Sequence, residues 1–383
     1  MTSLPKGFRA TGVAAGLKPS GAVDLGLLVS EMQATAAGVF TTNRVAAAPV
    51  QLSRRHLRRG VARAVVVNSG NANAATGSRG LADARAMAKT AGSALGLRER
   101  DVLVASTGII GVYMPIAKVL TGIGAAAGSV SAGGLDHFAT AIMTTDTRMK
   151  VAEASAGNAR LVGVAKGAGM IAPEMATMLC FIATDAEVDR GVLYDSLHRA
   201  TSASFNLIDV DGCRSTNDCI FVLANGAAGP VDGEAFEAAL VEVCRSLARQ
   251  VVEDAEGATK VVAITVRSAS NVKEARKAAA AIASSLLLRC ALAGADPNWG
   301  RVLAALGVSN IPFDPAVVDV WLGGEKVCER GAPGPGDVQK AGAAMGEREI
   351  EIIAELNRGG AEATVLTNDI TAEYIRLNTE YTT

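Results

Sequence analysis

Residues Ala165–Ala186 read AKGAGMIAPEMATMLCFIATDA, a glycine-rich turn that leads into a short apolar run. The run TMLCFIATDA has the length and residue types of a buried strand, and runs of the same kind recur along the chain. They are VARAVVVNSG (61–70), DVLVASTG (101–108), NARLVGVAKG (158–167), NDCIFVLANG (217–226) and ATKVVAITVRS (258–268). Most are separated by longer stretches, which is typical of an α/β protein.

Helical periodicity fills much of the sequence between these runs, with apolar residues spaced three and four apart. The windows are Gly80–Leu95, Leu135–Met143, Gly191–Ala203, Gly233–Ala255 and Val272–Leu292. A chain of 383 residues exceeds the usual size of a single hydrophobic core, so we expect at least two domains. A shift in composition near residue 265 predicts the start of a smaller C-terminal lobe.

Composition and charge argue against several classes of partner. The formal net charge is -1, so the chain has no overall basic field to attract nucleic acid or anionic lipid. The first twenty residues lack the continuous apolar core of a secretory signal, and the apolar stretch Ala278–Ala295 is interrupted by polar residues. We therefore expect a cytoplasmic protein without a transmembrane segment.

The six cysteines and three histidines form no recognisable metal site, because there is no CxxC pair and no histidine at ligand spacing. We expect the cysteines to be small buried hydrophobic residues. The string DVDGCRSTND (209–218) resembles a calcium loop, but its glycine comes too early and the glutamate at position twelve is missing. We interpret it as a turn between a strand and a helix, and expect neither a metal nor a cofactor.

The shortage of histidine also limits how a nucleophile could be activated. No histidine lies near a Gly-x-Ser-x-Gly elbow, and neither GxxxxGK[ST] nor a complete GxGxxG is present. A threonine at a chain end would need no histidine, because its hydroxyl is the nucleophile and its own α-amine is the base. Such an amine has a pKa of about 7.7–8.0, which suits neutral pH.

The segment Ala165–Ala186 closely resembles the signature of the ornithine acetyltransferase (glutamate N-acetyltransferase) family. The resemblance extends over nearly the whole chain. It includes VVVNSGNANAATG (65–77), STGIIG (106–111), MTTDT (143–147), EGATK (256–260), DPNWGR (296–301) and YIRLNTEYTT (374–383).

Membership of this family would give Thr177 a role that its own surroundings do not, because most threonines that enter an apolar run are only strand formers. Family members cleave themselves at the Ala-Thr bond of the signature, which corresponds to Ala176–Thr177. The resemblance thus implies an α chain of residues 1–176 and a β chain of residues 177–383. Thr177 would then carry acetyl from N-acetylornithine to glutamate in a ping-pong reaction.

The other functional residues follow from the same resemblance. Thr107 and Gly108 match the oxyanion-hole threonine and glycine of the family. The residues that match substrate contacts are Thr144, Lys166, Thr177, Glu256, Asn378 and Thr383. Thr145 stays open as an alternative to Thr144, and for DPNWGR we expect a packing role.

The resemblance further implies a layered αββα sandwich of the ornithine acetyltransferase/DmpA-like type, with intertwined fragments that dimerise as pairs. Shared motifs leave open whether acetyl-coenzyme A is also a donor. An aminopeptidase or amidohydrolase with the same cleaved threonine, and an uncut binding or scaffold protein, remain the alternatives.

Overall fold

The apolar runs quoted above all form strands in the computed structural model, which describes residues 2–172 and 178–380. They contribute to the larger of two sheets or open the smaller one. The strands of the larger sheet are β1 (Phe8–Val13), β2 (Leu25–Phe40), β3 (Val61–Asn68), β4 (Val102–Ser106), β5 (Lys150–Ala156), β6 (Ala159–Lys166), β7 (Leu179–Glu187) and β8 (Cys219–Pro230). Their order is β4-β3-β2-β8-β7-β6-β5, with β1 paired to β2.

Strand β2 joins two arms of this sheet. It is 16 residues long, and its ladder with β3 shifts register between Val29 and Ala34. It pairs with β3 at Leu25–Val29 and again at Ala34–Thr35, and with β8 from Thr35 to Phe40. Because β2 belongs to both arms, strands far apart in the sequence share one core, which includes Val67 of β3 and Phe181 of β7.

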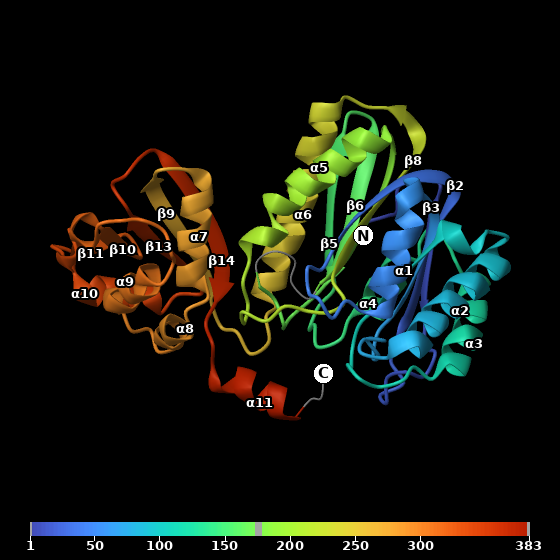
Figure 1. The fold of residues 1–383 in the computed structure, drawn as a ribbon, viewed down its shortest axis with the longest axis horizontal. Helices are drawn as coiled ribbons and strands as arrows, with labels where there is room; N and C mark the ends of the chain where they lie inside the picture. The colour runs from blue at the N-terminus through green and yellow to red at the C-terminus, as the bar shows by residue number, and fades with distance from the viewer. Residues whose placement is uncertain (1, 173–177, 381–383) are drawn as a thin grey trace.

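Helices cover the outer faces of the two arms, as Figure 1 shows. One outer face is covered by α1 (Ala48–His56), α2 (Gly77–Leu95) and α3 (Ile116–Ala127), the other by α5 (Arg190–Ser202) and α6 (Gly233–Glu253). Between the arms, α4 (Leu135–Ile142) places Phe138 against Phe181, with ring centroids 5.4 Å apart. The layered αββα class predicted from the family resemblance is confirmed.

The smaller C-terminal α/β lobe is built on a second sheet, in the order β12-β11-β10-β13-β9-β14. Its strands are β9 (Val261–Ala269), β10 (Asp319–Leu322), β11 (Glu325–Glu329), β12 (Ala332–Pro333), β13 (Glu349–Glu355) and β14 (Ala361–Asn368). Its helices are α7 (Val272–Ala283), α8 (Leu286–Ala293), α9 (Trp299–Gly307) and α10 (Val338–Met345). The expected single helix over 272–292 was wrong, because Ser285 starts α8 by accepting a hydrogen bond from the Leu288 amide.

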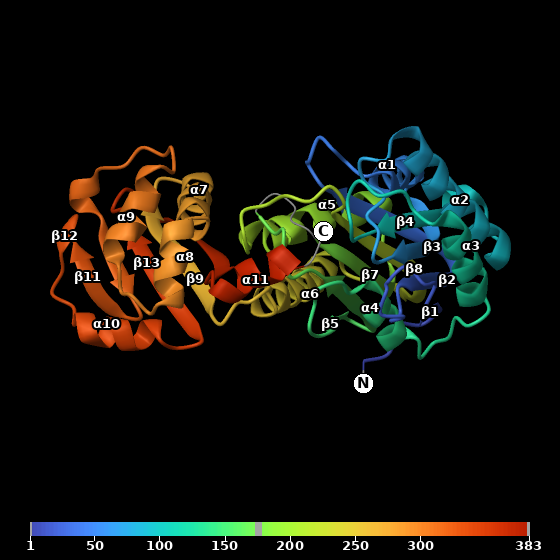
Figure 2. The same ribbon diagram turned by 90° about the horizontal axis from the view of Figure 1, so that it is seen from below.

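The last described helix, α11 (Ala372–Glu380), leaves the smaller lobe and returns to the larger sheet (Figure 2). It buries none of its residues. Its approach depends on Gly257, whose φ is +66° and where a Cβ atom would lie 2.4 Å from the Tyr374 nitrogen. No helix in residues 2–172 or 178–380 is both long and apolar enough to cross a membrane.

Candidate active site

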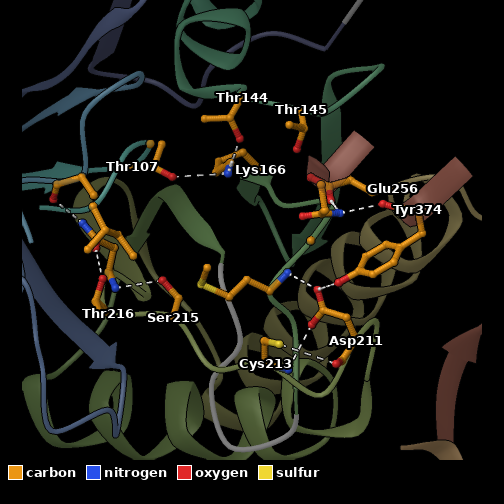
Figure 3. A pocket seen from close by; sticks show the side chains of 17 residues that line it. Thr107, Thr144, Thr145, Lys166, Asp211, Cys213, Ser215, Thr216, Glu256 and Tyr374 are labelled. Carbon is orange, nitrogen blue, oxygen red and sulfur yellow. Dashed lines mark hydrogen bonds between the residues drawn. The ribbon is translucent and has the colours of Figure 1, made fainter. Parts of the chain in front are cut away.

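Six of the predicted site residues line one pocket between the larger sheet and α11 (Figure 3). They come from segments that are far apart in the sequence. These residues are Thr107, Gly108, Thr144, Lys166, Glu256 and Asn378. Thr145, the alternative to Thr144, lines the same pocket.

The turn after β4 holds Thr107 in place. The Thr107 amide donates to the Asn68 carbonyl oxygen at the end of the neighbouring strand β3, at 3.0 Å. Gly108 has a φ of +128°, and a Cβ atom there would lie 2.4 Å from the Gly70 carbonyl carbon. Only glycine fits this turn without displacing the backbone.

Lys166 ends β6 and turns its ammonium toward two threonines. Its Nζ donates to Thr144 Oγ1 at 2.7 Å and to Thr107 Oγ1 at 3.4 Å. An ammonium has only donors, so both hydroxyl oxygens accept, and each threonine keeps its own proton for another partner. Lys166 is 3% exposed, and this burial lowers the pKa of its ammonium.

A buried charge network lies behind Lys166. The Asp146 carboxylate accepts from the Gly167 amide at 2.7 Å, the Thr144 amide at 3.0 Å and Lys150 Nζ at 2.7 Å. Lys150 also donates to Asp254, at 2.5 Å. Burial would raise the pKa of Asp146, but Lys166 and Lys150 outweigh it and lower that pKa to about 2.

Glu256 lies across the pocket from the threonines. Its Oε2 accepts from Asn378 Nδ2 of α11 at 2.9 Å, and its own amide donates to the Ala168 carbonyl oxygen at 2.8 Å. A Cβ atom on Gly169 would lie 2.7 Å from this carboxylate. The predicted substrate contacts Glu256 and Asn378 are therefore in contact with each other.

Asp211 and Tyr374 also line the pocket. Both lie in stretches quoted above, but no pattern in those stretches marked either residue as part of a site. The Tyr374 hydroxyl donates to Asp211 Oδ2 at 3.2 Å. The loop that holds Asp211 follows a 3₁₀ turn (Phe205–Leu207) and leads into β8. The interpretation of residues 209–218 as a turn from a strand to a helix was therefore wrong. Cys213, expected to be buried, is exposed here, and Cys290 is exposed elsewhere.

Three predicted site residues, Ala176, Thr177 and Thr383, lie outside the described residues. The conspicuous DPNWGR segment does not line the pocket. There Asn298 starts α9 by accepting a hydrogen bond from the Arg301 amide, and Trp299 packs against the core of the smaller lobe. This placement agrees with a structural role for the segment.

The chain is thus an α/β protein with a layered αββα fold, and its pocket combines a buried ammonium with carboxylates. Residues 9–383 match the ArgJ family, and the chain belongs to this family of N-acyltransferases. The membership predicted from the sequence motifs is confirmed.

Close relatives are similar over their full lengths. The arginine biosynthesis bifunctional protein ArgJ of Thermus thermophilus is 48% identical over 99% of this chain and 99% of its own. The protein of that name from Symbiobacterium thermophilum is 46% identical over 100% of this chain and 98% of its own. A crystal structure of ArgJ from Bacillus halodurans is 33% identical with a TM-score of 0.51, and covers 52% of this chain and 98% of that chain.

Proposed function

We propose that the enzyme transfers the acetyl group of N-acetylornithine to glutamate, giving ornithine and N-acetylglutamate in arginine biosynthesis. The observation that carries this proposal is the pairing of opposite charges in one pocket, with Lys166 on one side and Glu256 and Asp211 on the other. Ornithine has an α-carboxylate and a side-chain ammonium. Lys166 would bind the carboxylate and Glu256 the ammonium.

The proposed nucleophile is Thr177, made available by cleavage of the Ala176–Thr177 bond. The Thr177 hydroxyl attacks the Ala176 carbonyl carbon, the peptide C–N bond breaks, and an ester replaces it. Water then hydrolyses the ester, which frees the Thr177 α-amine and hydroxyl. The Bacillus halodurans chain supports this step, because 98% of it corresponds to only 52% of the present chain, as expected for one fragment of a cut precursor.

In the transfer reaction, the free Thr177 amine takes the hydroxyl proton as Thr177 attacks the acetyl carbonyl. The proton passes to the leaving nitrogen, ornithine departs, and the glutamate α-amine then attacks the acetyl ester. Thr107 and Gly108 would stabilise the oxyanion of both tetrahedral intermediates, a contribution of about 2.7–4 kcal/mol per donor. The contact with Lys166 supports this oxyanion role of Thr107. The lysine donates to the threonine hydroxyl oxygen, so the hydroxyl proton is free to donate to the oxyanion.

Thr144, Asn378 and Thr383 complete the proposed substrate contacts. Thr144 is preferred to Thr145 because Lys166 donates to its hydroxyl. The bifunctional name of the relatives supports a second donor, acetyl-coenzyme A, for the same acceptor. We further propose that the two fragments stay together and that two such pairs assemble.

The test is an assay of purified protein with glutamate as acceptor and either N-acetylornithine or acetyl-coenzyme A as donor. We expect N-acetylglutamate with both donors, in amounts equal to the ornithine or coenzyme A released. Ornithine and acetate without N-acetylglutamate would instead identify a hydrolase. Activity in protein whose mass spectrum shows only an intact 383-residue chain would contradict the cleavage step.

A further inference from the structure

The loop Asp209–Asp218 contacts the chain on both sides of residues 173–177, the segment that contains the proposed cleavage site. On the upstream side, the Asp211 carboxylate accepts from the amides of Met170 at 2.5 Å and Ile171 at 2.9 Å. The Val210 amide returns a hydrogen bond to the Ile171 carbonyl oxygen at 2.8 Å. Two neighbouring loop residues, Val210 and Asp211, therefore bind the Met170 and Ile171 amides and the Ile171 carbonyl oxygen.

The backbone at Met170 is shaped for this contact. Met170 has a φ of +59°, a conformation that non-glycine residues rarely adopt and that costs free energy. In this conformation the Met170 and Ile171 amides converge on the two oxygens of one carboxylate. Asp211 thus stabilises a strained backbone at Met170, seven residues before Thr177.

On the downstream side, the other end of the same loop holds Met178. Asp218 is fully buried, and its Oδ1 accepts from the Met178 amide at 3.1 Å. The Cys219 amide donates to the Met178 carbonyl oxygen at 3.2 Å. Both backbone hydrogen-bonding groups of Met178, the residue directly after Thr177, are therefore bound, one by Asp218 at the end of the loop and one by Cys219 at the start of β8.

The loop is itself anchored to the smaller lobe. The Asp209 amide donates to the Leu366 carbonyl oxygen of β14 at 2.9 Å. Arg289 of α8, which is 1% exposed, donates to the Asp209 carboxylate and to the Val210 carbonyl oxygen. A loop fixed from behind in this way can hold two stretches of chain at a set separation.

We propose that the loop Asp209–Asp218 is the template for self-cleavage, with Asp211 and Asp218 as positioning residues. They hold Met170–Ile171 and Met178, the described residues on the two sides of the segment that contains the Ala176–Thr177 bond. The inference rests on the proposed cleavage and adds the device that aligns it. Attack of a hydroxyl on the adjacent carbonyl requires close alignment, and a misplacement of about 1 Å can cost a factor of about 10² in rate. Holding both flanks also removes chain entropy before the attack.

The test compares Asp211→Asn with a matched control, Asp185→Asn. Asp185 of β7 is 1% exposed and also accepts from two backbone amides, those of Lys6 at 3.1 Å and Arg160 at 2.7 Å. An asparagine supplies one acceptor oxygen where the carboxylate supplies two. Both variants should therefore lose stability, but only Asp211→Asn should lose alignment at the cleavage site.

The readout is the rate at which the 383-residue precursor is converted into fragments of residues 1–176 and 177–383, followed by mass spectrometry after synthesis in a cell-free system. We expect Asp211→Asn to slow cleavage at least tenfold, Asp218→Asn to act in the same direction, and Asp211→Glu to recover part of the rate. Asp185→Asn should cleave at the wild-type rate.

Two results would count against the template. One is cleavage of Asp211→Asn and Asp218→Asn at the wild-type rate, and the other is equal slowing by Asp185→Asn, which would reduce the effect to lost stability. Thermal unfolding of the uncut variants measures that loss separately. A wild-type chain that never cleaves would contradict the proposed function instead, so the two failures are distinguishable.

Discussion

Lys166 connects the charge network of the interior with the two threonine hydroxyls of the pocket. Its ammonium loses hydration on burial, and Asp146 and Glu256 partly compensate by favouring the charged form. The ammonium donates to the hydroxyl oxygens of Thr107 and Thr144. The protons of both hydroxyls therefore stay available as the donors that the mechanism needs. Loss of its proton would remove the proposed carboxylate contact.

The pH dependence of substrate binding should report this proton. Because burial lowers the Lys166 pKa, we expect the KM for N-acetylornithine to rise on the alkaline side at pH values below the ordinary lysine pKa of 10.5. In Lys166→Met the KM should be high and nearly independent of pH. Steady-state kinetics across the alkaline range measures both, and an identical KM profile in the two proteins would refute the assignment.

Asp146→Asn should destabilise the fold, because it leaves Lys150 and Lys166 with one buried carboxylate fewer. Breaking a buried pair costs about 3–5 kcal/mol, measurable by urea unfolding at pH 7. The native pKa of about 2 lies below the ordinary 3.8, so this stabilisation is complete above pH 4 and is lost as the pH falls toward 2. The difference in unfolding free energy between wild type and variant should therefore decrease by about 2 kcal/mol as the pH falls over that range. A difference that stays constant would contradict the charge assigned to Asp146.

At the scale of elements, α11 is held by a few contacts at the pocket rather than by buried apolar surface. Gly257→Ala should displace it, since the added methyl would meet the Tyr374 nitrogen. Gly157→Ala in the β5–β6 turn is the matched control, with a φ of +60° and open space around it. Both should lose about 1–2 kcal/mol of stability from the left-handed backbone. Only Gly257→Ala should lower kcat/KM, by at least tenfold, and equal kinetics would show that α11 has no part in the site.

Removal of residues 378–383 should separate activity from folding even more clearly. α11 has no buried residue, so the truncated chain should unfold within about 1 kcal/mol of wild type. The deletion takes away Asn378 and its bond to Glu256, as well as the predicted contact Thr383. We expect turnover of N-acetylornithine to fall at least a hundredfold, and undiminished turnover would exclude the tail from the site.

Local patterns in the sequence predicted elements well and their partners poorly. The run TMLCFIATDA becomes β7, because an unbroken apolar run indicates a strand buried on both faces. β2 was missed, since Leu25–Phe40 is interrupted by polar residues and changes neighbours at a register shift. Periodicity does not show where a strand shifts register or changes its neighbouring strand. Lys166 and Glu256 were found through the family resemblance, whereas Asp211 looked only like part of a turn.

At the scale of the whole molecule, the strand order interlocks the two proposed fragments. β7 and β8 belong to residues 177–383, yet they lie between β2 and β6 of residues 1–176. Separation would break the β2–β8 ladder from Thr35 to Phe40 and the β6–β7 ladder from Leu161 to Lys166. It would also expose the core between the arms. Cleavage of one peptide bond should therefore leave the sheet intact.

Size-exclusion chromatography of fully cleaved enzyme should show both fragments in one peak, at every dilution at which the enzyme stays active. In urea the fragments should separate only as the larger sheet unfolds, because the exposed apolar core makes dissociation and unfolding one cooperative event. Circular dichroism and fragment release should share one midpoint. Release of residues 1–176 before the loss of β-sheet signal would show that β2 and β6 can leave β7 and β8 without unfolding, contrary to this strand order.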